Sequence, residues 1–258
     1  MDLASLLQLP PGGLEVALLV LVRISALFVL APVFGHANIP IRVRVAAAVL
    51  VGVLLVPMAL AGPRPDVSTP YLLTLAIAGE LTVGLTLGFV ASLFFHGVQF
   101  AGYLLGLQMG FGMNQMYDPT TRNSTTELGV LLSLVATVSF LASNAHHWLL
   151  AAIWRSFHAI PLGTFVLRGP VVEKVVMASA GIFDIALTIM LPISGVILVI
   201  ELALAILNRV IPQMNVFAIG TGAKILLGMT AISATLPLMG STFDILIDRL
   251  SRQLISFF

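Results

Sequence analysis

The sequence contains no cysteine, and charged residues make up only 9% of its 258 residues. Without cysteine the chain has no disulfide, no thiolate metal site and no cysteine nucleophile. An ordinary soluble domain has about a quarter of its residues charged, whereas this chain is 59% hydrophobic with a mean hydropathy of +1.10. A formal net charge of +1 argues against the concentrated basic face that binds nucleic acid. The composition therefore predicts an integral membrane protein with no nucleic-acid partner.

Long apolar runs set the architecture. A helix needs about 20 mostly apolar residues to cross a bilayer, and about six or seven such elements follow one another here. Residues 71–116 and 171–207 are too long for one straight span. We expect the first run to bend or fold back near His96 and Gly97, and the second to kink near Pro192 and Gly195. The predicted fold class is all-α: one helical membrane domain over residues 1–258, made of long kinked helices and helical hairpins.

The tail of the chain differs in kind from the runs before it. From about residue 243 to 258, apolar residues recur at helical spacing and charged residues occupy the opposite face. The apolar stripe is Phe243, Ile247, Leu250, Leu254 and Phe258, and the charged face is Asp244, Asp248, Arg249 and Arg252. This pattern predicts an amphipathic C-terminal helix for a membrane surface or a partner.

Five ionisable residues fall inside apolar runs: Arg23, Glu80, Asp184, Glu201 and Lys224. Each costs about 2.5 to 3.5 kcal/mol at mid-membrane, so something must compensate for them. One interpretation is an ion or proton pathway. The other, which we favour, is pairing between helices, with Glu80 or Glu201 bound to Arg23 or Lys224. A transporter usually also has broken-helix symmetry, and no such symmetry is visible in this sequence.

Glycines at a spacing of four mark two helix faces where another backbone can come close. Gly84 and Gly88 follow Glu80 on one face, and Gly102, Gly106 and Gly110 share another. The second face leads into a segment with flexible methionines at 109, 113 and 116, and Asp118-Pro119 is expected to stop the helix. From these residues alone the methionine segment fits a conformable plug and a packed core equally well. Ser124 to Glu127 then fits a capping box, so a new helix is expected near residue 124.

No motif for catalysis, metal binding or a cofactor stands out. The histidines at 96, 146, 147 and 158 lack the His-Glu-x-x-His pattern, and adjacent histidines point to different helix faces. The sequence also lacks a nucleophile elbow and a phosphate-binding loop. We therefore expect no catalytic residue, no metal and no cofactor, and interpret the histidines as polar residues near an interface.

Several of these patterns, taken in order along the chain, resemble the FliR family of flagellar export-gate proteins, whose virulence counterpart is SctT. They are Gly79-Glu80 with Gly84 and Gly88, Gly102 to Gly110 ending in Leu-Gln-Met-Gly, Asp118-Pro119, Ile160-Pro-Leu-Gly163, and Gln213 to Gly220. The resemblance covers nearly the full length. It implies a non-enzymatic, multi-pass subunit of a helical export-gate assembly, in the bacterial inner membrane at the flagellar basal body.

The resemblance also implies partners and a role for the methionine segment. The partners would be FliP-like and FliQ-like gate subunits, a large cytoplasmic export component of the FlhA/FlhB type, the membrane lipid, and the unfolded flagellar proteins that are exported. The pore plug would comprise Met109, Gly110, Phe111, Gly112, Met113, Asn114, Gln115, Met116 and Tyr117. The alternative is a proton-coupled secondary transporter that uses Glu80, Asp184 and Glu201.

Overall fold

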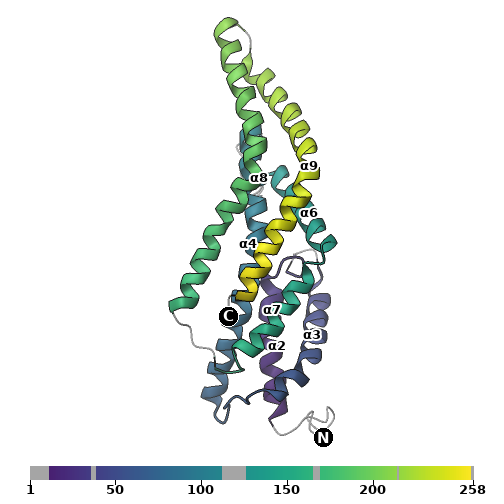
Figure 1. Ribbon diagram of the computed structural model, residues 1–258, viewed down its shortest axis with the longest axis vertical. Coiled ribbons are helices and arrows are strands. Elements are labelled where there is room, and N and C mark those ends of the chain that lie inside the picture. The colour runs from purple at the N-terminus through teal and green to yellow at the C-terminus, as the bar shows by residue number, and fades with distance from the viewer. Residues whose placement is uncertain (1–11, 36–38, 112–125, 165–168, 214, 257–258) are drawn as a thin grey trace. The chain divides into compact units, whose positions relative to one another are not determined.

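Helices are the sole regular elements across residues 12–35, 39–111, 126–164, 169–213 and 215–256, which are the parts that this computed structural model describes (Figure 1). In chain order the helices are α2 (Gly13–Leu30), α3 (Ile41–Ala61), α4 (Pro70–Met109), α6 (Glu127–Ala142), α7 (His146–Ala159), α8 (Gly169–Val210) and α9 (Val216–Ser256). The predicted all-α fold class is confirmed.

Membrane-spanning length is common among these helices. Five of them are long and apolar enough to cross a bilayer, or six spans if α6 and α7 are counted together as one. The five lie within α2, α3, α4, α8 and α9. Their mean hydropathy reaches 2.5 in α8 and 2.4 in α3, as expected for helices in contact with lipid or with other apolar helices. The chain is a multi-pass membrane protein.

The residues group into two compact units. The first comprises Met1–Leu93, Asn144–Ser179 and Arg249–Phe258, and the second comprises Phe94–Ser143 and Ala180–Asp248. Helices α4, α8 and α9 therefore contribute residues to both units. The prediction of one domain over residues 1–258 and that of an amphipathic C-terminal helix stay predictions. In the C-terminal part of α9, Phe243 and Ile247 are buried while Asp244 and Asp248 are exposed.

The first unit is built around α2, which packs against α3 and the first part of α4. Leu19, Ile24 and Leu27 of α2 are 0% exposed, as are Val83 and Leu87 of α4. These residues are apolar and recur at helical spacing, so they form one packed seam, and between membrane helices such van der Waals packing favours association.

The second unit combines the end of α4 with α6 and the hairpin of α8 and α9. Its aromatic contacts are edge-to-face: Phe100 meets Phe183 with ring centroids 5.9 Å apart, and Phe95 meets Phe140 at 5.3 Å. A polar contact also joins α8 to α4, where the hydroxyl of Ser194 donates to Oε1 of Gln108 at 2.7 Å. In this way α8 is tied to α4 by one hydrogen bond and by aromatic packing.

The long helices are more continuous than the sequence suggested. Helix α4 runs through His96 and Gly97 as one helix of 40 residues, so the prediction that this run could fold back there is wrong. Gly97 is instead a close-approach point, because a Cβ placed on it would lie 2.8 Å from Cγ2 of Ile185 on α8. Glycine keeps its amide donor, so the helical hydrogen bonds continue through it. Helix α8 contains Pro192 within its 42 residues, and the predicted kink near Pro192 and Gly195 stays a prediction.

Candidate functional site

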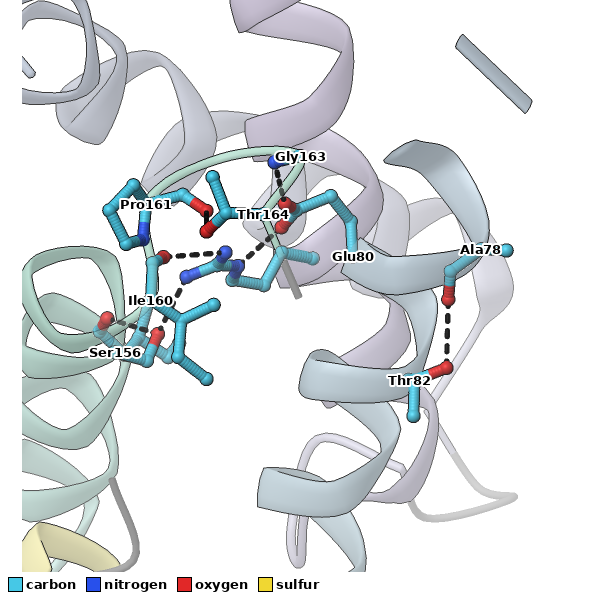
Figure 2. A network of polar contacts seen from close by, with 10 residues as sticks. Ala78, Glu80, Thr82, Ser156, Ile160, Pro161, Gly163 and Thr164 are labelled. Carbon is cyan, nitrogen blue, oxygen red and sulfur yellow. Dashed lines mark hydrogen bonds and ion pairs between the residues drawn. The ribbon is translucent and has the colours of Figure 1, made fainter. Parts of the chain in front are cut away.

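A buried ion pair in the first unit joins three helices (Figure 2). Nε of Arg23 on α2 lies 2.5 Å from Oε2 of Glu80 on α4. The guanidinium also donates to the Ser156 hydroxyl of α7 at 3.2 Å and to the carbonyl of Ile160 at 3.1 Å. The other carboxylate oxygen, Oε1, accepts from the amide of Gly163 at 2.9 Å. Both charges thus bind the turn after α7 as well as each other.

The burial of these two charges explains why they need so many partners. The side chains of Arg23 and Glu80 are 1% and 0% exposed, and an unpaired charge at such a position would cost several kcal/mol. The guanidinium carbon of Arg23 also lies 4.3 Å from the ring centroid of Phe157, a cation–π contact. Each guanidinium nitrogen of Arg23 and each carboxylate oxygen of Glu80 therefore has a partner within the protein.

The turn that the pair holds has little freedom to change. Gly163 has a φ of +73°, in the left-handed region that disfavours residues with a Cβ. A Cβ on Gly163 would also lie 2.9 Å from Cβ of Pro65, in the segment between α3 and α4. The Ile160-Pro161-Leu162-Gly163 sequence therefore packs as a fixed turn, with a glycine where the backbone requires one.

The remaining charges in the apolar runs have different surroundings. Lys224 Nζ on α9 lies 2.9 Å from Oε1 of Glu201 on α8, and their side chains are 25% and 49% exposed. Asp184 is exposed in the single chain. The structure thus brings Arg23 together with Glu80, and Lys224 with Glu201. Burial of Asp184, Glu201 and Lys224 is not seen in the chain by itself, and for an assembly it stays a prediction.

In the first unit, glycines on α4 lie directly against the backbone of α2. A Cβ on Gly84 would overlap the carbonyl oxygen of Arg23, and one on Gly88 would lie 2.7 Å from the carbonyl oxygen of Leu27. These separations are well below the 3.5 to 4.0 Å of ordinary van der Waals contact. Gly84 and Gly88 therefore let α2 approach α4 closely enough for Arg23 to reach Glu80.

In the second unit, Gly102 and Gly106 lie against the start of α6. A Cβ on Gly102 would lie 2.6 Å from Cα of Gly129, and one on Gly106 would lie 2.5 Å from Oγ1 of Thr126. We call Gly102, Gly106, Thr126 and Gly129 the glycine seat. Because α4 and α6 meet at the seat, the two ends of the connection between them are held side by side.

Thr126 is the residue of the seat whose role was not predicted from the sequence. Its hydroxyl accepts from the amide of Gly129 at 3.2 Å and donates to the carbonyl of Gly102 at 3.1 Å, and the residue is 1% exposed. The capping residue of α6 is therefore Thr126, and the assignment of that role to Ser124 is wrong. The tertiary contact decides the position, because only the residue facing Gly102 and Gly106 gains both bonds. Threonine directly before the apolar run was the available signal.

The end of α4 is a Schellman motif. The amide of Phe111 donates to the carbonyl of Gly106 at 2.9 Å, and the amide of Gly110 donates to Leu107 at 3.1 Å. Gly110 has a φ of +94°, the left-handed conformation that this motif requires. The helix thus ends at Met109, and the prediction that Asp118-Pro119 ends it is wrong. A left-handed glycine satisfies the last carbonyls at an earlier position.

The predicted plug residues divide at this helix end. Met109 is 0% exposed, and a Cβ on Gly228 of α9 would lie 2.6 Å from its Cε atom. Met109 is therefore part of the packed core of the second unit. Phe111 is half-buried. The other predicted plug residues lie outside the described residues: Gly112, Met113, Asn114, Gln115, Met116 and Tyr117.

Within the described part of the chain, no three His, Asp or Glu side chains lie close enough together to hold a metal ion. The rings of His146 and His147 are tilted by 48° with centroids 4.3 Å apart, and His158 packs against Trp154 in a similarly tilted arrangement. The side chains described above therefore support close helix packing around an ion pair whose charged atoms all have partners.

The fold and these sites define a class: a multi-pass helical membrane protein held together by close glycine contacts. Residues 14–250 match the model of the family described as bacterial export proteins, family 1. The chain is 31% identical to flagellar biosynthetic protein FliR of Escherichia coli (strain K12), covering 85% of this chain and 83% of that protein. It is 32% identical to FliR of Pectobacterium carotovorum subsp. carotovorum, covering 90% and 91%. With FliR of Bacillus subtilis (strain 168) the identity is 35%, and 81% of each chain is covered. The chain belongs to this family of bacterial export proteins, and its predicted resemblance to FliR is confirmed.

Proposed function

We propose that this chain is a non-enzymatic membrane subunit of the flagellar protein export apparatus. Family membership over residues 14–250 and the flagellar FliR relatives support this role. The finer proposal is that the chain helps to form the export pore in the bacterial inner membrane. In this role it joins FliP-like and FliQ-like subunits and an FlhA/FlhB-type component, and unfolded flagellar proteins pass through the pore.

The proposal includes closure of the pore by the segment that follows α4. The observation that carries it is the glycine seat: Thr126 bonds to Gly102 and abuts Gly106. Both ends of the connection between α4 and α6 are thereby fixed at one place. Helix α4 also ends sharply, at Met109 with the left-handed Gly110 directly after it, so the described chain provides a rigid base before the proposed plug segment. A rigid base under a methionine-bearing segment suits a deformable seal.

Exposed apolar surface on the spanning helices supports a role within an assembly. On α3, Leu50, Val53 and Leu54 are 65%, 61% and 69% exposed, and on α8 Val199 and Ile206 are 64% and 66% exposed. Lipid and apolar partner helices can both cover such faces.

The alternative of a proton-coupled transporter has less support. Glu80 is bonded through both oxygens to Arg23 and Gly163, and Glu201 is paired with Lys224. A carboxylate whose oxygens are occupied by fixed partners suits a structural pair better than a proton carrier, whose oxygen must be open to exchange a proton.

The closure proposal is tested by replacing Phe111–Tyr117 with a glycine-serine linker of equal length, which leaves Gly110 and the seat intact. We expect the gate to assemble, as judged by co-purification of FliP-like and FliQ-like subunits, while small ions and dyes leak across the inner membrane. The matched control replaces the polar half of the same connection, residues 118–123, with the same kind of linker, and no leak is expected. Normal permeability in an assembled gate with the first replacement would refute closure by this segment. If the unmodified chain co-purified with no export subunit, the proposal that it is a subunit of the export apparatus would be refuted.

A further inference from the structure

A pocket in the second unit lies where the end of α4 meets the hairpin of α8 and α9. Its volume is about 420 Å³. A water molecule takes up about 30 Å³ in the liquid, so the pocket has room for several waters. Apolar side chains form part of the wall, and polar side chains from all three helices form the rest. The polar residues of the wall are Gln108, Glu201, Asn208, Thr221 and Lys224.

Some of these polar groups keep hydrogen-bonding capacity that the described residues do not use. An ammonium group has three N–H donors, and the one hydrogen bond of Lys224 within the described part of the chain goes to Oε1 of Glu201 at 2.9 Å. The Oε1 atom of Gln108 accepts from Ser194, which leaves the two N–H donors of that amide. Donors from α4 and α9 are therefore available to a polar ligand in the pocket.

The polar wall occupies one face of α8, and the opposite face is apolar. Glu201, Ala205 and Asn208 all line the pocket, and they lie within about 60° of one another around the helix axis. Val199 and Ile206 lie on the other side of the helix and are 64% and 66% exposed. Helix α8 thus offers an apolar face to lipid or to partner helices and keeps its polar groups on the pocket side.

The ion pair of the pocket lies in segments that are apolar enough to cross a membrane. Glu201 falls within the span Val171–Val210 and Lys224 within Ile219–Pro237. Their side chains are 49% and 25% exposed, and a charge that is open to hydrocarbon is costly. Charged residues of spanning helices therefore face the protein interior or a water-filled cavity.

We propose that this pocket is a water-filled site within the membrane-embedded part of the hairpin, and that small hydrophilic molecules reach the Glu201–Lys224 pair through it. Water suits the wall because one water molecule both donates and accepts hydrogen bonds. The pair is neutral overall, so the pocket does not favour an ion of one sign over water. The pocket reaches Asn208, near the end of α8, so it lies toward one surface of the membrane, from which water can enter.

Single cysteines test the proposal without interference, because the sequence contains no cysteine of its own. Ala205→Cys places a thiol in the pocket wall. Ala203→Cys is the matched control, since Ala203 is also exposed but lies on the opposite face of the same helix. The full chain is reconstituted into phospholipid vesicles, with a charged, water-soluble methanethiosulfonate present on both sides of the membrane.

The reagent reacts with the thiolate, which forms in water and not in hydrocarbon. We expect Ala205→Cys to be labelled at least about tenfold faster than Ala203→Cys, because a thiol that faces lipid stays un-ionised. Both variants should be labelled fully after denaturation in detergent, as measured by the mass of the intact chain. Circular dichroism confirms that each variant keeps its helix content.

The charges of the pair give a second readout at the thiol introduced at position 205. Glu201→Gln leaves the positive charge of Lys224 without its partner, so labelling by an anionic reagent should rise relative to a cationic one. About fivefold is expected, the effect of two unit charges roughly 4 Å apart in water. Lys224→Gln should shift the ratio in the opposite direction. Lys174→Gln, at the start of α8, is the control for loss of one positive charge outside the pocket and should leave the ratio unchanged.

Three results would overturn the proposal. Slow labelling of both cysteines in the folded chain would mean that lipid or protein fills the pocket. Fast labelling of both would place this length of α8 in bulk water, with no pocket inside the membrane. A ratio of anionic to cationic labelling that is the same in all charge variants would mean that the ion pair does not face the water at position 205. Because no export partner takes part in the test, its failure would leave the proposed role in export standing.

Discussion

Arg23 and Glu80, which are 57 residues apart in sequence, form a fully buried ion pair with a 2.5 Å contact between Nε and Oε2. The two side chains also bind opposite ends of one turn, Arg23 at the carbonyl of Ile160 and Glu80 at the amide of Gly163. The pair is therefore a junction of α2, α4 and the turn after α7. The effect of a substitution should depend on which of these contacts the new side chain can still make.

Glu80→Gln should be tolerated far better than Glu80→Leu or Glu80→Lys. Glutamine has nearly the shape of glutamate, and its amide oxygen can still accept from the Gly163 amide. Leucine leaves the buried Arg23 charge without its partner, which costs about 3 to 5 kcal/mol. Fluorescence-detected size-exclusion chromatography of the heated full chain would rank the variants by their midpoint of thermal unfolding.

Export assays on the same variants separate a structural role from proton transfer. If Glu80→Gln assembles and keeps a nearly normal unfolding midpoint but exports nothing, a proton-carrying role for Glu80 gains support and the structural role fails.

Removing both members of the pair should cost less than the sum of the single removals. Arg23→Leu and Glu80→Leu each strand a buried charge, whereas the double variant strands none. We expect a coupling free energy of about 2 kcal/mol or more in a double-mutant cycle. Lys224→Leu with Glu201→Leu is the control cycle, because that pair is 25% and 49% exposed and should couple by about 1 kcal/mol or less. Equal coupling in both cycles would show that burial does not set the strength of the Arg23–Glu80 pair.

The sequence identifies Arg23 and Glu80 as charges that need a partner, but it does not show that they pair with each other. Arg23 and Glu80 stand out because a charge in an apolar run needs compensation. Which acid meets which base depends on which helices pack together, and that is a property of the whole chain. The roles of Ser156 and Gly163 were invisible for the same reason, since a hydroxyl or a backbone amide gains a partner only after folding.

Glycine spacing was informative because it is a local property of one helix face. Gly84, Gly88, Gly102 and Gly106 each lie against a neighbouring backbone or side chain in the structure, but the identity of that neighbour could not be read from the spacing. The ends of helices were harder to predict from the sequence. The residues on both sides of Gly110 are apolar, so hydropathy continues where the backbone turns, and only the left-handed glycine marks the end of α4.

Gly102→Ala should destabilise the chain, whereas Gly222→Ala should not. A methyl group on Gly102 would lie 2.6 Å from Cα of Gly129, while nothing lies within 4 Å of a Cβ on Gly222. Overpacking at the first position should cost about 1 to 3 kcal/mol. At the second, alanine should stabilise α9 by up to about 1 kcal/mol through its higher helix propensity. The midpoint of thermal unfolding is measured for each purified full-length variant. Similar midpoints for Gly102→Ala and Gly222→Ala would refute the close contact at Gly102.

Gly110→Ala and Gly110→Asn distinguish backbone strain from crowding at the end of α4. Both variants add a Cβ, which would lie 3.2 Å from Cγ2 of Thr221, so crowding is shared. Asparagine tolerates a positive φ better than alanine does, and the φ here is +94°. We expect Gly110→Ala to cost about 1 to 2 kcal/mol and Gly110→Asn to cost less. Equal unfolding midpoints would indicate that the left-handed conformation does not limit this position.

Thr126 should need its hydroxyl more than its methyl group. Thr126→Val keeps the shape of the side chain that fills the space beside Gly106, but it removes the acceptor for the Gly129 amide and the donor to Gly102. Loss of a helix cap costs about 0.5 to 2 kcal/mol, and the upper end is expected because the residue is buried. Thr126→Ser keeps both hydrogen bonds and loses only one methyl group, so its unfolding midpoint should stay closer to that of the unmodified chain. Hydrogen exchange at the Gly129 amide should quicken in Thr126→Val and not in Thr126→Ser. The reverse order would mean that methyl packing against Gly106, and not the shared hydroxyl, holds α6 on α4.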